Sequence, residues 1–162
     1  MDRIIPGSGQ ESVWDYPRPP RAETCCKSLT IVFADQVLVE TTQSIRVLET
    51  SHPPVYYIPL EIFEPGVLLP TDRQTLCEWK GVARYYHVMV DDFAAEYAAW
   101  SYCKPTPVFE LLRDHVAFYA HAMDSCRVDG ERVHAQLGGF YGDWVTKDIA
   151  GPFKGTPGTD DW

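Results

Sequence analysis

The sequence predicts a mainly β protein, and two kinds of pattern carry this prediction. Residues 29–33 and 45–49 place apolar side chains at every second position, which is the period of a strand with one buried face. Asp129-Gly130 stands between two short strand-like runs and is the strongest hairpin signal in the chain. Local propensity argues clearly for a helix only over the alanine-containing residues 94–100.

The remaining elements follow from the same signals, with prolines and glycines marking their ends. In chain order we expect a hairpin over residues 28–40 that turns at Ala34-Asp35-Gln36, strands over 44–49 and 55–59, a helical turn at 60–63, strands over 75–80 and 84–90, the helix over 94–100, a short helix over 108–114, a strand over 116–120 and a hairpin over 126–133.

A chain of 162 residues has the length of one domain and buries roughly 70% of its unfolded surface without metal ions or disulfides. Prolines disfavour helix over residues 1–27, so this segment is expected to be an extended arm packed on the body by its aromatic side chains; a disordered tail is the alternative. Residues 28–135 form the expected β domain. Residues 136–162, which include Gly138-Gly139-Phe140-Tyr141, form a second, irregular arm.

Composition and charge exclude several classes of protein. The net charge of −9 argues against nucleic acid as a partner, although one or two cations can still form a local anion site. No run of about 18 apolar residues predicts a membrane span, and the N-terminus lacks the apolar core of a secretory signal. The five cysteines, two of them adjacent at Cys25-Cys26, make a poor disulfide framework, so we expect reduced thiols in a cytoplasmic protein.

Four segments occur in the order in which they are found in the family catalogued as domain of unknown function 427, which the chain resembles over roughly residues 28–133. They are residues 47–59, 77–85, 99–102 and 116–119. The resemblance implies a small antiparallel domain of two sheets that lean together like a β-tent, with one or two short helical turns and extended terminal arms. It also implies a strand at Trp100-Ser101-Tyr102, against the local helix prediction.

The family carries a nucleotidyltransferase-like label, which the sequence does not support. Such a site needs a glycine-serine turn followed by acidic residues at alternate strand positions to hold two Mg²⁺. Here Gly7-Ser8-Gly9 lies in the expected arm, and Asp91-Asp92 are adjacent. The chain also departs from the family pattern at Glu78, where proline is usual, and at Cys103.

Lys80-Gly81 is the leading candidate for a ligand site. An ammonium group binds carboxylate or phosphate, and a glycine lets a ligand approach the backbone. The alternative is that Lys80 forms a salt bridge with Glu49 or Glu78. Glu49 ends an otherwise apolar strand face and is a candidate general base if apolar walls raise its pKa; the alternative is that it lies in water where the strand leaves the core.

Four aromatic residues are candidates for the walls of a pocket, with ordinary core packing as the alternative. They are Tyr57, Tyr85, Trp100 and Tyr102. Cys77 beside Lys80 is either an activated thiolate or a small buried apolar residue. The cysteines lack the two-residue spacing of a zinc knuckle, so neither a metal nor another cofactor is expected.

Two functions follow from these candidates. The first is a binding protein, monomeric or homodimeric, in which Tyr57, Lys80, Gly81, Trp100 and Tyr102 hold a small polar or anionic metabolite. The alternative is a cofactor-free isomerase, cyclase or lyase that transfers protons through Glu49, Lys80 and Tyr85. A structural protein with a purely aromatic core is the third possibility. Both site hypotheses require Glu49, Lys80, Tyr57 and Trp100 to converge on one cavity.

Overall fold

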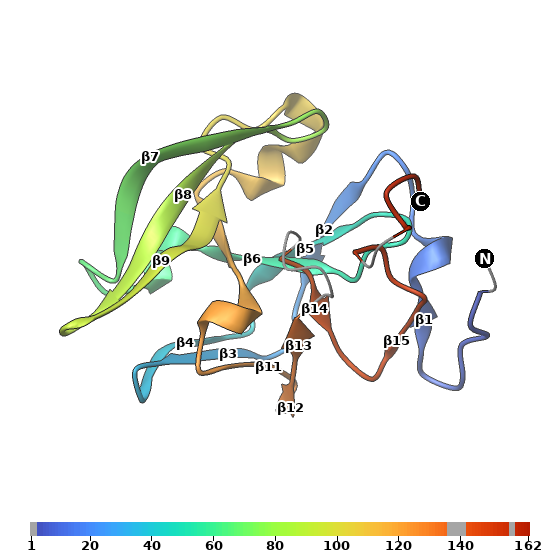
Figure 1. Cartoon of the computed structure of the whole chain (residues 1–162), viewed down its shortest axis with the longest axis horizontal. Helices are drawn as coiled ribbons and strands as arrows, with labels where there is room; N and C mark the ends of the chain where they lie inside the picture. Colours follow the sequence, from blue (N-terminus) through green and yellow to red (C-terminus); the bar gives the residue numbers. More distant parts are fainter. Residues whose placement is uncertain (1–2, 136–141, 156–157) are drawn as a thin grey trace.

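The computed structural model describes residues 3–135, 142–155 and 158–162, and two antiparallel sheets dominate that part of the chain (Figure 1). The larger sheet contains, in spatial order, β2 (Arg21–Cys25), β5 (Ser44–Leu48), β6 (Val55–Pro59), β10 (His115–Phe118), β9 (Phe93–Ser101), β8 (Gly81–Val90) and β7 (Leu68–Cys77). The smaller contains β12 (Glu131–Arg132), β11 (Ser125–Val128), β3 (Leu29–Phe33) and β4 (Gln36–Thr41). The predicted mainly β class is confirmed.

Both predicted tight hairpins form where their turn residues accept a positive φ. The β3–β4 turn places Ala34 at φ 51° and Asp35 at φ 60°. The β11–β12 turn does the same at Asp129, φ 50°, and Gly130, φ 82°. Two successive residues with positive φ give a turn whose twist matches that of the flanking strands.

The helix predicted over residues 94–100 is wrong, because this segment is most of strand β9. It pairs with a neighbour on each side: Trp100 lies opposite Tyr85 of β8 and opposite Ala117 of β10. The helix preference of alanine amounts to less than about 1 kcal/mol per residue, which two ladders of backbone hydrogen bonds and a buried position outweigh. The strand that the family resemblance implies at Trp100-Ser101-Tyr102 is confirmed for Trp100 and Ser101, whereas Tyr102 follows the end of β9.

Short 3-10 helices stand at the expected helical turns. The turn predicted at 60–63 is η2 (Leu60–Ile62), and the short helix predicted over 108–114 is η3 (Pro107–Leu112). Two more were not predicted, η1 (Val13–Asp15) and η4 (Ala120–Ala122), and η4 takes the end of the strand predicted over 116–120. No helix in the described residues has the length and apolar character needed to span a bilayer.

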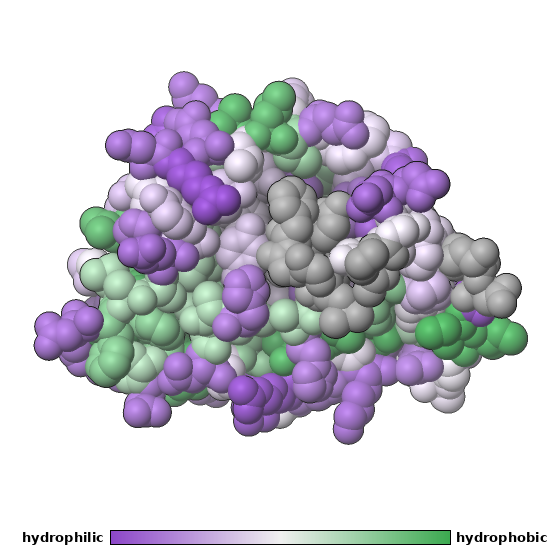
Figure 2. Space-filling view, viewed as in Figure 1, coloured by the Kyte–Doolittle hydropathy of each residue, from purple (hydrophilic) through white to green (hydrophobic). Residues whose placement is uncertain are grey.

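The large sheet is buried on both faces in its central strands. Because successive side chains of a strand point to opposite faces, Tyr56 and Ile58 of β6 enter the core that lies against the small sheet, whereas Tyr57 enters a second cluster on the other face. Phe109 and Leu112 of η3 belong to that second cluster. The outward side of the small sheet, along the lower edge of the molecule, carries hydrophilic side chains (Figure 2).

The terminal segments pack on the body beside β5. Strand β1 (Glu11–Ser12) pairs in parallel with β15 (Ile149–Ala150), and Val13 and Tyr16 bury against Leu48. Residues 21–25, expected within the first arm, form β2 at the edge of the large sheet. Near the end of the chain β13 (His134–Ala135) pairs with β14 (Trp144–Val145). The expectation for residues 138–141 lies outside the described residues.

Candidate functional site

A cleft of about 670 Å³ opens on the face of the large sheet that carries the second aromatic cluster. Its walls come from β6, the connection that precedes it, the β7–β8 hairpin, β9 and the segment before β14. The structure brings together at this cleft six of the residues predicted from the sequence: Glu49, Tyr57, Lys80, Tyr85, Trp100 and Tyr102. Their roles in binding or catalysis stay predictions.

Gly81 does not line the cleft, although Lys80 beside it does. Its φ of +111° is one that other residues rarely adopt, and a Cβ placed on it would lie 3.2 Å from the backbone oxygen of Lys104. The backbone that approaches this glycine closely is therefore the chain's own.

Lys80 lies in the turn between β7 and β8, not on a strand as predicted. Strand β7 ends at Cys77, so the alternation of faces expected through residue 80 stops there. Thr106 fixes the turn: its hydroxyl donates to the Trp79 carbonyl at 2.7 Å and its N–H to the Lys80 carbonyl at 3.1 Å. The side chain of Lys80 is thereby aimed at the cleft from a backbone-anchored position.

The Lys80 ammonium lies 5.8 Å from the centre of the Tyr102 ring. It forms no salt bridge or side-chain hydrogen bond within the described part of the chain, so neither of the predicted bridges, to Glu49 or to Glu78, is present there. Burial lowers the pKa of Lys80, but electrostatic interactions with Tyr102 and Cys77, and to a smaller extent with Glu49 and Asp143, together raise it above its ordinary value. Lys80 is therefore an ammonium at neutral pH.

Glu49 also lines the cleft and is held by two basic side chains. Its Oε2 lies 3.5 Å from an Arg18 guanidinium nitrogen and 3.7 Å from His52 Nε2. Arg18 also donates to the backbone oxygen of Thr50 at 2.7 Å. With 23% of its side chain exposed, Glu49 is neither fully wet nor sealed in the core.

His52 and Asp143 form a buried pair that sequence reasoning missed. His52 Nδ1 lies 3.1 Å from Asp143 Oδ2, and both residues line the cleft. Burial raises the pKa of Asp143, while the His52 hydrogen bond and the Lys80 charge lower it by less. In the sequence His52 stands before two prolines, at His52-Pro53-Pro54, and this local pattern does not mark it as functional. Its partner comes 91 residues later, so no local pattern could have joined them.

An interlocked set of rings forms the aromatic wall. The Trp100 indole donates to the Tyr57 hydroxyl at 3.3 Å and lies with its ring centre 4.6 Å from that of Tyr119. Burial raises the pKa of Tyr57 and of Tyr102, so both remain neutral phenols at physiological pH. A Cβ on Gly142 would lie 2.1 Å from the Trp100 ring, so only glycine fits there without displacing the indole.

Comparison with known protein families gives one match. A family model described as a domain of unknown function (DUF427) matches residues 21–129. The chain belongs to the DUF427 family. No curated protein matches the sequence.

The DUF427 match divides the cleft into two parts. Glu49, His52, Lys80 and Trp100 fall inside the matched residues, whereas Asp143 comes from beyond them. The partner of His52 in this DUF427 chain is thus supplied by the segment that follows the family domain.

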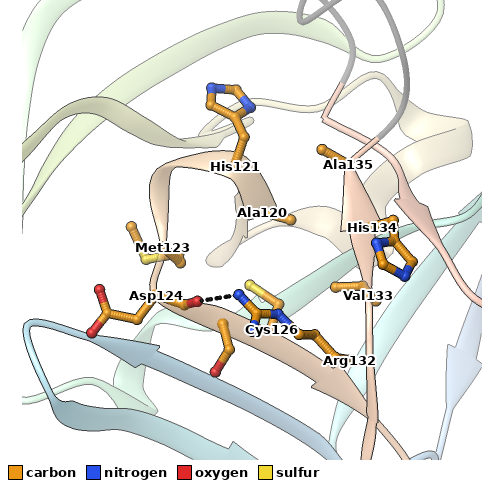
Figure 3. Close-up of a pocket in the computed structure, with 10 residues that line it drawn as sticks. Ala120, His121, Met123, Asp124, Cys126, Arg132, Val133, His134 and Ala135 are labelled. Atoms are coloured by element: carbon orange, nitrogen blue, oxygen red, sulfur yellow. Dashed lines mark hydrogen bonds between the residues drawn. The ribbon is translucent and has the colours of Figure 1, made fainter.

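A smaller pocket of about 220 Å³ lies between η4 and strands β11 to β13 (Figure 3). Arg132 crosses it to donate to the backbone oxygen of Asp124 at 3.0 Å. Burial raises the pKa of the Cys126 thiol to about 12, so it is neither a thiolate nucleophile nor a ready metal ligand at neutral pH. Among the described residues no three His, Cys, Asp or Glu side chains gather to hold a metal ion. The chemistry-bearing side chains gather in the larger cleft.

Proposed function

We propose that the cleft binds a small anionic molecule, with the Lys80 ammonium as its anchor and the rings of Tyr57, Trp100 and Tyr102 as its wall. One observation carries this proposal. Lys80 faces the cleft without a salt bridge in the described residues, while Glu49 is held by Arg18 and Asp143 by His52. The two carboxyl groups that act electrostatically on Lys80 are thus engaged elsewhere.

A ligand carboxylate or phosphate would satisfy that ammonium. A charge-assisted hydrogen bond is stronger than a neutral one, and a partly desolvated cation gains more from it than an exposed one. The cleft volume of about 670 Å³ lies within the range of small-molecule sites, which are mostly apolar with a few polar anchors. The phenol groups are neutral, so they can form hydrogen bonds with an anion without repelling it.

Capture of metabolites from a cell lysate tests this proposal. Wild-type protein, Lys80→Ala and Lys104→Ala are each incubated with the same lysate, washed, and their retained small molecules identified by mass spectrometry. Lys104 is the matched control, because it is an exposed lysine on the segment that backs the same turn. We expect wild type and Lys104→Ala to retain the same anion and Lys80→Ala to bind it about 10 to 100-fold more weakly. Equal retention by all three proteins would remove Lys80 as the anchor.

A second candidate function is acid–base catalysis without a cofactor, and the row formed by Glu49, His52 and Asp143 favours it. A carboxylate on each side of an imidazole is an arrangement that can accept and pass on a proton. The Lys80 ammonium would stabilise negative charge on the bound molecule. The Tyr85 hydroxyl, 2.9 Å from the Thr75 hydroxyl at the same cleft, is the candidate second proton carrier.

Incubating the captured molecule with the protein in heavy water separates the two functions. An enzyme of this kind exchanges a carbon-bound proton for deuterium, and Glu49→Gln should slow that exchange at least about tenfold. If the mass of the captured molecule is the same after incubation with and without the protein, no exchange has occurred and the protein is a binding protein.

We place this activity in the cytoplasm. All five cysteines are free thiols, which fits a reducing compartment.

A further inference from the structure

Arg73, like Lys80 and Lys154, brings a cation to the lining of the cleft. Its guanidinium carbon lies 4.8 Å from the centre of the Tyr85 ring and 5.0 Å from that of Tyr97. All three residues line the cleft. Across the described ranges, Arg73 forms no salt bridge and donates no side-chain hydrogen bond, even though Glu96 lines the same end.

Two irregularities in neighbouring strands bring these groups together. The β7–β8 ladder shifts register between Pro70 and Gln74, and Arg73 lies in that interval. The β8–β9 ladder shifts between Tyr86 and Val88, where Tyr97 takes a φ of 52° and donates its N–H to His87 Nδ1 at 3.0 Å. A bulge re-aims the side chains of the residues around it. Without that shift Tyr97, three positions before Trp100, would point to the opposite face of β9.

The cation–π contacts with the two rings leave the N–H donors of Arg73 without a side-chain hydrogen bond in the described residues. These five donors lie in the plane of the guanidinium and point outward from its edge. That edge matches the two oxygens of a carboxylate or phosphate. An arginine held in this way is oriented before the ligand arrives.

Lys80 and Arg73 mark two ends of one aromatic floor. Lys80 lies over Tyr102 and Arg73 over Tyr97, and these tyrosines are five positions apart along β9 and its continuation. At about 3.3 Å per residue their backbones are separated by at most roughly 16 Å. Trp100, whose indole donates to the Tyr57 hydroxyl, lies between them along the chain.

We propose that Arg73 is a second anion anchor, so that the ligand of this cleft carries an acidic group at each end of a flat apolar body. The inference rests on the proposed function, because it adds a second contact to a molecule that Lys80 already holds. It narrows the ligand from any small anion to an elongated aromatic or conjugated diacid.

The test uses matched pairs of synthetic probes with wild-type protein. Each pair is an aromatic monoacid and the diacid of the same body, with benzene, naphthalene and biphenyl bodies to vary the separation of the acids. Affinities are measured by titration calorimetry for wild type, Lys80→Ala, Arg73→Ala, Arg73→Lys and Arg84→Ala. Arg84 is the control, since it is the exposed arginine next to Tyr85 on β8 and does not line the cleft.

For at least one body length, wild type and Arg84→Ala should bind the diacid about tenfold or more tightly than the monoacid. Arg73→Ala should bind the two acids of that pair equally, Arg73→Lys should recover part of the difference, and Lys80→Ala should bind both acids more weakly. Thermal melting of each variant checks that it is folded.

Failure of this inference is distinguishable from failure of the proposed function. If the monoacids bind in a Lys80-dependent way and no diacid gains from its second group, the Arg73 anchor is overturned while the Lys80 site stands. If Lys80→Ala binds every probe as wild type does, both proposals fall together.

Discussion

Burial and neighbouring groups shift the pKa of several side chains that line the cleft. Lys80 keeps its proton because its electrostatic interactions with Tyr102, Cys77, Glu49 and Asp143 together outweigh its desolvation. Burial has the larger effect at Asp143. It raises the pKa of that carboxyl group, and the His52 contact and the Lys80 charge lower it by less. Tyr57 and Tyr102 stay neutral because burial raises their pKa. One wall thus carries a cation and uncharged hydroxyls, which suits an anionic guest.

The substitution Asp143→Asn should change how the free energy of unfolding depends on pH, because it removes a buried carboxyl group. Because the pKa of Asp143 is higher in the folded chain than its ordinary value, its contribution to stability is complete below about pH 4 and is lost as the pH rises toward the folded pKa. The free energy of unfolding of wild type minus that of Asp143→Asn should therefore fall above about pH 4. Urea denaturation at a series of pH values measures it.

Asp148→Asn is the control for that experiment, with the opposite sign. Burial alone would raise the pKa of Asp148, but hydrogen bonds from Lys27 and Thr146 lower it. Its contribution is present above about pH 4 and is lost as the pH falls below that value. A wild-type advantage over Asp143→Asn that stays constant from pH 4 upward would contradict the assignment of a raised pKa.

At the level of elements, the β7–β8 turn is the device that places Lys80. Gly81→Ala should disturb it in two ways, by strain at φ +111° and by crowding against the Lys104 carbonyl. Strain of this kind costs on the order of 1 to 3 kcal/mol. Gly66→Ala has a similar backbone strain at φ +88° but open space for the new methyl group. We expect a larger loss of unfolding free energy for Gly81→Ala, measured by urea titration, and weaker ligand retention in that variant alone. Equal losses would show that the Lys104 contact is without effect.

The sequence predicted those elements whose signals are local. The Asp129-Gly130 turn is specified by its own two residues, since both tolerate positive φ. Residues 94–100 were predicted wrongly because they form a strand by pairing with β8 and β10, and local propensity takes no account of such pairing.

The residues of the candidate site also differ in whether a local signal could reveal them. Lys80 and Trp100 could be found in motifs, whereas the His52–Asp143 pair depends on a contact across 91 residues. The position of Arg73 depends on a register shift between β7 and β8 that no residue pattern predicts.

Over the whole molecule, the decisive property is a central sheet with side chains buried on both faces. Several of its tyrosines, and Tyr16 of the first arm, are enclosed deeply enough that burial raises their pKa. The enclosing layers are the small sheet on one side and η3 with the cleft walls on the other. The fold is therefore sensitive to anything that charges its interior.

Alkaline titration should show this as a single cooperative step. A phenol whose folded pKa lies above its unfolded value of about 10 contributes stability below that pH, and loses it as the pH rises further. We expect the buried tyrosines to ionise together with unfolding, followed by phenolate absorbance and by circular dichroism on the same sample. The urea-unfolded chain, as control, should titrate smoothly near pH 10. Ionisation of all tyrosines before any loss of circular dichroism would contradict the burial of these rings.

The placement of the indoles has a practical consequence. Of the five tryptophans, Trp79 and Trp100 line the cleft, while Trp14 and Trp162 pack edge to face against each other and Trp144 lies in the main core. A guest lying against the aromatic wall would change the emission of the first two and leave the other three untouched. The protein therefore carries its own optical reporter, and a fluorescence screen of unlabelled compounds needs no chemical modification of the chain.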